Sequence, residues 1–397
     1  MKKIFNALNQ KLPILSWADY IEDGALEQAI NLSNHPCVVD HVVLCPDVHS
    51  GYGMPIGGVI AVEDAVIPNA VGVDIGCSMS ACKTNVPVSE VDVELLKKIV
   101  GGSKEYPGGI RANIPTGMSH NNKKQDHKIF ADRARWDDTI ICKGEIESAQ
   151  YQLGTMGGGN HFIELQAGDD GYLWYMIHSG SRNLGYKVGN YYNEVAEKLC
   201  TMYKQTDVVK NKLAFLPRGT EQFDQYINEM NLCLDFAKAN HDKMIEKLEG
   251  IIAHFIPGCV FDEHYYSRHN YASIENQMNR NLFIHRKGAI RVRTGDIAII
   301  PGSQGTASYI VEGLGNPASF CSASHGSGRV MSRTKAQAEL SLKAEQERMK
   351  GIVHNITSEK QLDEAPSAYK DIDEVIKAES DLVKVVTKLK PLAVVKG

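Results

Sequence analysis

Apolar residues recur along the chain with two different periods, which predict separate helices and strands. Spacing of three to four residues runs through residues 221–252 and predicts a long helix with one apolar face. The same spacing predicts helices at residues 25–32, 91–100, 189–205, 334–350 and 372–389. Short apolar runs predict buried strands at residues 37–45, 162–165, 173–177 and 297–300. Helices and strands therefore alternate along the chain without any internal repeat.

Glycine-rich loops follow several of these strands and carry the polar residues of interest. Residues 46–58 (PDVHSGYGMPIGG) predict a sharply turned loop, in which Asp47 and His49 are either functional or simple turn residues. Because loops from strands along the whole chain would have to meet at one place, we expect a single α+β domain over residues 1–397, with mixed central β-sheets and peripheral helices. Residues 101–128 lose periodicity and are rich in lysine and histidine, so they form either a solvated loop or a flexible basic flap over a polyanionic substrate.

Composition narrows the class of protein. The 397 residues carry a net charge of −5 with a pI near 6.3, so no global basic field holds nucleic acid, and a polyanion must meet local basic residues. The N-terminal segment lacks the pattern of a signal peptide and no stretch has the length of a membrane span, which predicts a soluble, cytoplasmic protein without membrane contact. Nine cysteines without paired spacing predict reduced thiols.

The segment PNAVGVDIGCSMSAC, residues 68–82, places Asp74 and Cys77 on one tight turn in apolar surroundings. A carboxylate and a thiolate three residues apart can reach one divalent cation, and a cysteine sulfur can bridge two. A buried acid needs compensation of its charge, and a metal ion supplies it. The same residues also fit an aspartate bound by turn amides beside an inert core cysteine.

Two further glycine-rich segments carry histidines. In YQLGTMGGGNHFIELQ three glycines precede Asn160 and His161, which favours backbone contact with a phosphate, and Glu164 follows on a predicted strand. In HSGSR, His178 leaves a strand into a turn that contains Arg182, which fits either a metal ligand or a capping loop.

The last third of the chain contains two more glycine-rich loops with polar residues. PGSQGTASY, residues 301–309, offers hydroxyls and free amides suited to phosphate or base contacts. SASHGSGRVMSR contains His325, whose glycine neighbours would give access to a nucleophile, although a turn histidine fits as well. The chain ends in an apolar run with a penultimate Lys396, whereas an ordinary solvated tail would be polar.

Five candidate donors lie in separate glycine-rich segments: Asp74, Cys77, His161, His178 and His269. Mixed oxygen, nitrogen and sulfur donors suit two transition-metal ions such as Mn²⁺ or Zn²⁺ better than Mg²⁺. Two metal ions hold phosphates and polarise them for displacement. Pattern and composition thus indicate a metal-assisted phosphate enzyme and leave its reaction open.

The motifs identify a family more narrowly. PDVHSGYGMPIGG, VGVDIGC, LGTMGGGNHFIE, HSGSRNLG, HNY, RKGA, PGSQGTASY, SHGSGRVMSR, AYKDID and the terminal VVKG, in this order, resemble the RtcB family of GTP-dependent RNA ligases, in its shorter bacterial form. The resemblance implies that Asp74, Cys77 and His161 bind one Mn²⁺. It also implies that Cys77 bridges to a second Mn²⁺ held by His178 and His269, and that His325 attacks the α-phosphorus of GTP.

The resemblance also implies a GTP site and RNA contacts. The implied GTP-binding residues are Asn160, His161, Phe162, Ile163, Glu164, His269, Asn270, Pro301, Gly302, Ser303, Gln304, Ser308, His325, Gly326, Ser327, Gly328, Tyr369 and Lys396. The candidates for RNA phosphate contacts are Arg182, Lys287, Arg329 and Arg333. Three positions depart from the common family pattern, namely Gln304 for methionine, Arg268 for a second histidine, and Ser327 for alanine.

The implied reaction joins an RNA 3′-phosphate or 2′,3′-cyclic phosphate end to a 5′-hydroxyl end, through a histidine–GMP adduct, in tRNA splicing or RNA repair. Participation of an activating protein such as archease stays open. Two other functions compete with ligation: a two-metal phosphodiesterase that acts on RNA ends without GTP, and a non-catalytic protein that binds RNA ends or nucleotides. The second would predict loss of His325 or Lys396, and the sequence retains both.

Overall fold

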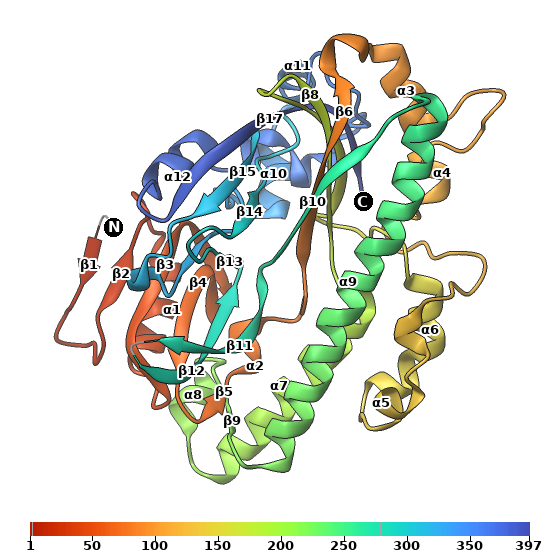
Figure 1. Cartoon of the computed structure of the whole chain (residues 1–397). Coiled ribbons are helices and arrows are strands. Elements are labelled where there is room, and N and C mark those ends of the chain that lie inside the picture. Colours follow the sequence, from red (N-terminus) through yellow and green to blue (C-terminus); the bar gives the residue numbers. More distant parts are fainter. Residues whose placement is uncertain (2, 278) are drawn as a thin grey trace.

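The computed structural model describes residues 1, 3–277 and 279–397, which form two β-sheets with helices around them (Figure 1). The first sheet has six strands in the order β1 (Lys3–Phe5), β2 (Ile14–Ser16), β3 (Val38–Tyr52), β4 (Met54–Val62), β12 (Arg280–Lys287) and β11 (Asn270–Gln277). The β2–β3 pair is parallel and the others are antiparallel, so this sheet is mixed.

The second sheet positions most of the candidate site. Its seven strands are antiparallel and lie in the order β10 (Phe261–Arg268), β6 (Ser78–Pro87), β8 (Tyr172–Ser179), β7 (Phe162–Gly168), β17 (Val383–Lys396), β15 (Ser308–Gly313) and β14 (Ile297–Ile300). Two small pairs accompany the sheets: β13 (Ala289–Arg291) with β16 (Ser322–Ser324), and β5 (Ala65–Val66) with β9 (Leu216–Pro217). The predicted α+β class is confirmed, and of the two large sheets the first is mixed whereas the second is antiparallel throughout.

The helices cover the sheets from outside. They are α1 (Asp23–Ser33), α2 (Pro68–Val71), α3 (Val93–Gly101), α4 (Ile110–Asn113), α5 (Arg133–Asp137), α6 (Ile146–Gln152), α7 (Arg182–Met202), α8 (Thr206–Lys210), α9 (Glu221–Phe255), α10 (Arg333–Glu339), α11 (Leu342–Arg348) and α12 (Ile372–Ala378). The longest, α9, crosses the molecule diagonally beside α7 (Figure 1), and its apolar stripe packs into the core as its spacing predicts. Among the described residues, none of the helices has the length and apolar character that a bilayer crossing requires.

The chain end differs from the predicted helix at 372–389. Helix α12 stops at Ala378, and β17 begins at Val383 and runs between β15 and β7 to Lys396. The run VKVVTK is rich in β-branched side chains, which favour a pleated sheet with neighbours on both sides. The apolar terminus is therefore a central strand, and this explains why it is not polar.

Two other predicted elements are also wrong in part. The helix predicted at 334–350 is broken into α10 and α11, because Leu340 and Leu342 both pack on the same small apolar cluster and two residues on one side require an extended backbone. The loop predicted at 46–58 is mainly strand: β3 and β4 meet at Gly53 (φ +73°), with register shifts around His49. Such bulges redirect single side chains, here near Asp47.

Residues 102–127 have little regular structure apart from α4, as the loss of periodicity predicts. Lys124 forms an ion pair with Glu147, and Asn121 donates to two backbone carbonyls, those of Tyr151 and Leu153. The flexibility of this segment stays a prediction. All nine cysteines are free thiols, as their spacing predicts.

Candidate metal centre and adjoining cavity

Neighbouring strands of the second sheet bring the thiol and the imidazoles together. Cys77 directly precedes β6, His161 directly precedes β7, and His178 lies in β8 between these two strands. His178 is opposite both Met79 and Phe162 in the strand register. Because antiparallel strands begin and end at a common edge, donors distant in sequence meet at one place.

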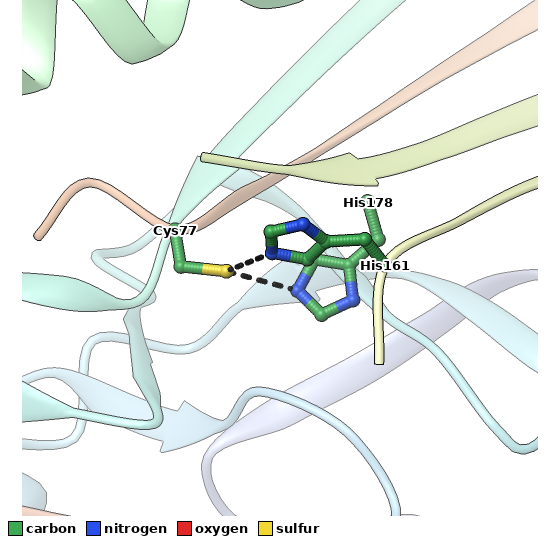
Figure 2. A group of neighbouring side chains, drawn as sticks. All are labelled: Cys77, His161 and His178. Carbon is green, nitrogen blue, oxygen red and sulfur yellow. Dashed lines mark hydrogen bonds between the residues drawn. The ribbon is translucent and has the colours of Figure 1, made fainter. Parts of the chain in front are cut away.

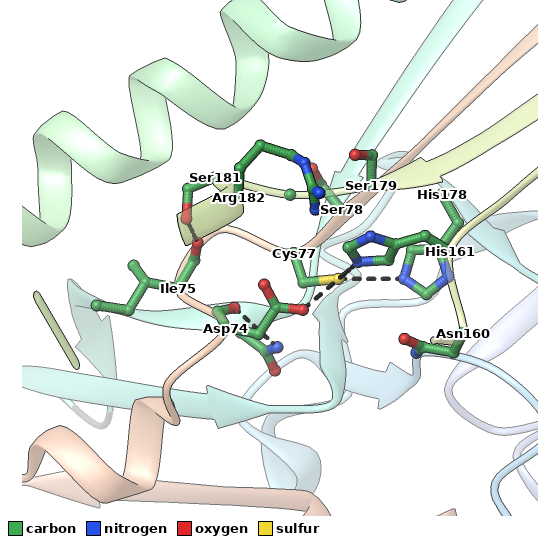
Figure 3. A network of polar contacts seen from close by, with 12 residues as sticks. Asp74, Ile75, Cys77, Ser78, Asn160, His161, His178, Ser179, Ser181 and Arg182 are labelled. Atoms are coloured by element: carbon green, nitrogen blue, oxygen red, sulfur yellow. Dashed lines mark hydrogen bonds and ion pairs between the residues drawn. The ribbon is translucent and has the colours of Figure 1, made fainter. Parts of the chain in front are cut away.

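Figure 2 shows the Cys77 thiol pointing at both imidazoles. The Cys77 Sγ atom lies 3.4 Å from His161 Nε2 and 3.2 Å from His178 Nε2, and all three side chains are buried. Asp74 approaches from the other side of the thiol (Figure 3), with its Oδ2 3.6 Å from His161 Nε2. Four of the five predicted donors therefore face one another.

His269 is the fifth predicted donor and joins the same cluster. Its ring centroid lies 5.2 Å from that of His178 and 4.8 Å from that of His325. The backbone N–H of His269 donates to the Cys77 carbonyl at 3.1 Å, which ties the end of β10 to the start of β6. The buried His269 Nδ1 has no hydrogen-bond partner within the part of the chain that the structure describes. A bound cation would satisfy this nitrogen.

The orientation of His161 also fits a metal ligand. Its Nδ1 lies 3.0 Å from the Met156 carbonyl, which places the ring proton on Nδ1 and leaves the Nε2 lone pair directed at Cys77. The Ser179 hydroxyl donates to the same carbonyl at 2.8 Å. The ring is therefore held by its neighbours in the tautomer that a metal ion requires.

The electrostatics of the cluster favour a bound cation. Burial, followed by the neighbouring imidazoles, lowers the pKa of both His178 and His269 well below the ordinary value, so both rings are neutral and can donate lone pairs. Burial and the Asp74 charge raise the pKa of the Cys77 thiol, so a thiolate there needs compensating positive charge. Desolvation opposes ionisation of Asp74, yet His161 and Cys77 lower its pKa to about 2.

Arg182 lies beside this cluster (Figure 3). Its Nε donates to Thr155 Oγ1 at 3.2 Å and its guanidinium packs on Gly157, where a Cβ atom would lie 1.9 Å from the Arg182 Nη1 atom. Gly157 also has φ +92°, a conformation that side chains disfavour. The glycine run therefore makes room for an arginine and does not only shape a loop.

His325 stands next to the donor cluster and is held by Asp47. The His325 Nδ1 lies 2.7 Å from Asp47 Oδ2, and the same oxygen accepts the His325 backbone N–H at 3.1 Å. Asp47 is fully buried, and its second oxygen, Oδ1, is left without a hydrogen-bond partner among the described residues. Gly328 (φ +72°) allows this approach, since a Cβ atom there would lie 2.1 Å from the Asp47 carbonyl oxygen. Nε2 is thus the free nitrogen of His325.

A cavity of about 470 Å³ opens in front of His325 and His178. Its lining includes many of the residues predicted to bind GTP, namely Asn160, Phe162, Pro301, Gly302, Ser303, Gln304, His325, Gly326, Ser327, Gly328, Tyr369 and Lys396. Arg329 and Arg333, predicted to contact RNA phosphates, also line it. The volume suits a nucleotide, at the lower end of the usual range for small-molecule sites.

The other residues predicted to bind GTP are not among those that line the cavity: His161, Ile163, Glu164, His269, Asn270 and Ser308. Asn270 Nδ2 donates to the Asp74 carbonyl at 3.1 Å. Glu164 and Ser308 are joined through the Gln166 amide, which lies 2.7 Å from Glu164 Oε2 and 3.2 Å from Ser308 Oγ. Burial raises the pKa of Glu164 to about 8, although the nearby Lys396 charge opposes this.

Another part of the cavity lining is built around Glu364, which the sequence alone did not single out. Its carboxylate lies 2.7 Å from Arg333 Nε, 3.2 Å from Arg329 Nη1 and 3.8 Å from Lys396 Nζ. It also accepts the Tyr369 hydroxyl. Burial alone would raise the pKa of Glu364, but Lys396, the Tyr369 hydrogen bond and the two arginines lower it. Three cations around one carboxylate leave this wall with net positive charge.

Lys287 is not part of the cavity wall. Its Nζ donates to the carbonyls of Tyr52 at 2.7 Å and Asn69 at 3.0 Å, and burial lowers its pKa to about 7. These contacts favour a structural role over the predicted RNA contact. Of the positions that depart from the family pattern, Gln304 and Ser327 line the cavity, and the Gln304 amide donates to the Glu364 carbonyl at 2.7 Å. The third, Arg268, lies 3.9 Å from Asp235 instead.

Together, the fold and the site define an α+β protein whose buried thiol–imidazole cluster borders a nucleotide-sized cavity, an arrangement typical of metal-dependent enzymes. Residues 28–397 match the family model described as tRNA-splicing ligase RtcB, and the chain belongs to this family. It is 36% identical to the RNA-splicing ligase RtcB of Escherichia coli K12 over 98% of both chains. It is 32% identical to the tRNA-splicing ligase RtcB of Nanoarchaeum equitans, with 95% of this chain and 92% of the relative covered. Identity to the Mycobacterium tuberculosis RNA-splicing ligase RtcB is 31%, with 93% of this chain and all of the relative covered.

Proposed function

We propose that this protein is a GTP- and Mn²⁺-dependent RNA ligase that joins RNA 3′-phosphate or 2′,3′-cyclic phosphate ends to 5′-hydroxyl ends. The observation that carries the proposal is the position of His325, held by Asp47 at the edge of a nucleotide-sized cavity and 4.8 Å, ring to ring, from the donor His269. A nucleophile, a cation site and an anion-binding wall around one cavity support nucleotidyl transfer. The names of the relatives support RNA as the acceptor.

The first chemical step is guanylylation of His325. Its Nε2 lone pair attacks the α-phosphorus of GTP, a P–N bond forms, and the bond to the bridging oxygen breaks to release pyrophosphate. Asp47 holds the Nδ1 proton and stabilises the positive charge that develops on the ring. A neutral imidazole is a competent nucleophile near neutral pH, and its phosphoramidate is reactive enough to pass GMP on.

Two Mn²⁺ ions would be held by the donor cluster: Asp74, Cys77 and His161 would hold one, and Cys77, His178 and His269 would hold the other. When bound, the ions would supply positive charge that stabilises the phosphates during displacement. Arg329, Arg333 and Lys396 would bind phosphate at the part of the cavity lining around Glu364, which forms ion pairs with all three. Arg182 is positioned by Thr155 to meet an RNA phosphate beside the cluster.

Two transfers complete the reaction. GMP passes from His325 to the RNA 3′-phosphate, after hydrolysis of a 2′,3′-cyclic phosphate where one is present. The 5′-hydroxyl of the second RNA then attacks this activated phosphate, forms the phosphodiester and displaces GMP. This chemistry serves either tRNA splicing or RNA repair, and nine free thiols suit a reducing cytoplasm.

The test is an assay of purified protein with Mn²⁺, α-labelled GTP and RNAs that carry 2′,3′-cyclic phosphate and 5′-hydroxyl ends. We expect labelled protein and joined RNA from the wild type, and neither from His325→Ala. His254→Ala, at an exposed histidine near the end of α9, is the matched control and should behave as wild type. Folded wild type that yields no label and no product would contradict the proposal. Cleavage of the cyclic phosphate without GTP, unchanged in His325→Ala, would instead support the phosphodiesterase. Addition of archease to the same assay tests whether it is a partner.

A further inference from the structure

The β6–β10 strand pair carries a second set of metal-binding side chains, distant from the first. Cys77 and His269 flank one end of this pair. Five residues farther along each strand, Cys82 lies directly opposite His264 in the register. At about 3.3 Å per residue, this separates the two Cys/His pairs by roughly 17 Å. Cys82 and His264 are therefore not part of the candidate metal centre.

Helix α9 supplies a third donor, Glu249. Its Oε1 atom lies 2.6 Å from His264 Nε2 and accepts the Tyr175 hydroxyl at 2.6 Å. The sulfur of Cys82, a carboxylate oxygen of Glu249 and a ring nitrogen of His264 all lie within 4.8 Å of one another. Tyr175 is opposite Cys82 on β8, so the set is built on three adjacent strands and the helix that covers them.

The three donors differ in solvent exposure, from a buried thiol to a partly exposed imidazole. Cys82 is fully buried, whereas the side chains of Glu249 and His264 are 22% and 42% exposed. A cation could therefore enter from solvent, take three protein ligands and keep a water molecule as the fourth. One thiolate, one imidazole and one carboxylate suit Zn²⁺ better than the harder Mn²⁺.

We propose that Cys82, Glu249 and His264 bind a thiophilic divalent cation of the Zn²⁺ class, at a site separate from the candidate metal centre. On binding, the Cys82 thiol gives its proton to solvent, and the His264 ring carries its proton on Nδ1 so that Nε2 can coordinate. The Tyr175 hydroxyl stays hydrogen-bonded to Glu249 and orients the carboxylate. The ion fastens the C-terminal part of α9 to the two strands that lead to Cys77 and His269.

The alternative is a hydrogen-bonded trio of His264, Glu249 and Tyr175 beside an inert thiol. Co²⁺ distinguishes the two, because a cobalt–thiolate bond gives a charge-transfer absorption band. The experiment uses the full chain with Cys77→Ala, which removes the thiolate of the candidate metal centre. We expect Co²⁺ to produce the band in this background at one equivalent, and Zn²⁺ to displace it.

Variants in the same background assign the band to its ligands. Cys82→Ser should abolish it, and Glu249→Gln should weaken Zn²⁺ affinity at least about tenfold while retaining the shape of the side chain. Tyr175→Phe, which keeps all three donors, should change affinity less than Glu249→Gln does. Zn²⁺ should raise the melting temperature of Cys77→Ala and not that of Cys77→Ala/Cys82→Ser.

Two results would overturn the proposal. A band that persists in Cys77→Ala/Cys82→Ser would place the thiolate elsewhere. Absence of the band in folded Cys77→Ala, with no Zn²⁺-dependent stabilisation, would leave the trio as an ordinary hydrogen-bonded network. Neither readout uses ligase activity, so the outcome is independent of the proposed function.

Discussion

The two walls of the cavity differ in what they require from a ligand. Beside one wall, which His178 lines, Cys77, His161 and His178 are buried lone-pair donors, and the Cys77 sulfur lies within hydrogen-bonding distance of both imidazoles. On the other wall, Arg329, Arg333 and Lys396 surround Glu364 and outnumber its single negative charge. The first wall needs a cation and the second needs an anion.

This difference explains how an acidic protein can act on phosphates. The net charge of −5 gives no general attraction for nucleic acid, but under the proposed function a metal ion at the donor cluster and the three local cations would together hold the phosphates of a nucleotide or an RNA terminus. His325 also lines this cavity, and its hydrogen-bond partner is Asp47.

The largest effect is expected on the donor wall. Cys77→Ala should reduce guanylylation at least about 100-fold, because loss of the thiolate would weaken both proposed metal sites. The measurement is Mn²⁺ bound per chain together with the rate of protein labelling. Cys37→Ser, at a partly buried thiol remote from the cluster, is the control and should retain both. Full metal binding and normal labelling in Cys77→Ala would refute the ligand assignment.

Asp47→Asn should slow guanylylation about 100-fold while Mn²⁺ binding stays unchanged. The amide cannot stabilise the developing charge on His325 as the carboxylate does, whereas the metal donors do not contact Asp47 through any hydrogen bond of the described residues. Single-turnover labelling at saturating GTP measures the rate, and its concentration dependence measures binding. If the loss lay only in GTP affinity, Asp47 would act on nucleotide binding and not on the nucleophile.

Lys396→Ala should weaken GTP binding about tenfold, with a smaller change in the rate at saturation. The Lys396 ammonium donates to the Asn160 carbonyl at 3.1 Å and is one of three cations on its wall, so the other two retain part of the attraction. The matched control is Lys390→Ala, at an exposed lysine of the same strand. Equal affinity in both variants would remove Lys396 from the site.

Glu164 should make the stability of the metal-free protein depend on pH. Its pKa is raised from 4.5 to about 8 in the folded state by burial, so the folded protein retains a proton that the unfolded chain loses. The contribution of Glu164 to stability is therefore fully present below about 4.5 and is lost as pH rises toward 8.

Relative to Glu164→Gln, the wild type should thus lose up to a few kcal/mol (~2–4 kcal/mol) of unfolding free energy over this range. Chemical denaturation at a series of pH values measures the difference. For Glu27→Gln, at an exposed residue of α1, the unfolding free energy should change with pH as it does in the wild type. If the plot of unfolding free energy against pH for Glu164→Gln also ran parallel to that of the wild type, the Glu164 carboxyl would be ionised over the whole pH range.

Much of the site could be predicted from the sequence because each donor lies beside its own glycine-rich motif. The five metal donors and His325 do lie together. The pairing of Asp47 with His325 could not be predicted. In the sequence, an aspartate in a turn cannot be distinguished from one that partners a histidine, and the strand bulge that orients the Asp47 side chain is seen only in the structure. The role of Glu364 could not be predicted either, since it depends on cations from two other segments, residues 329–333 and the end of β17.

The fold was predictable where periodicity was long and uniform, as in α9. It was not predictable at the chain end, where a helix was expected at 372–389 and β17 begins at Val383. There, strand neighbours at least 70 positions away, in β15 and β7, decide the structure and outweigh local spacing. Tertiary contacts of this kind are not encoded in a short window of sequence.

The most direct test of the central claim is a crystal of the protein grown with Mn²⁺ and measured at the manganese absorption edge. The account predicts two anomalous peaks that share the Cys77 sulfur as a ligand, one beside Asp74 and His161 and the other beside His178 and His269. Both should face the His325 ring. No peak at Cys77, or peaks only at sites remote from His325, would contradict it.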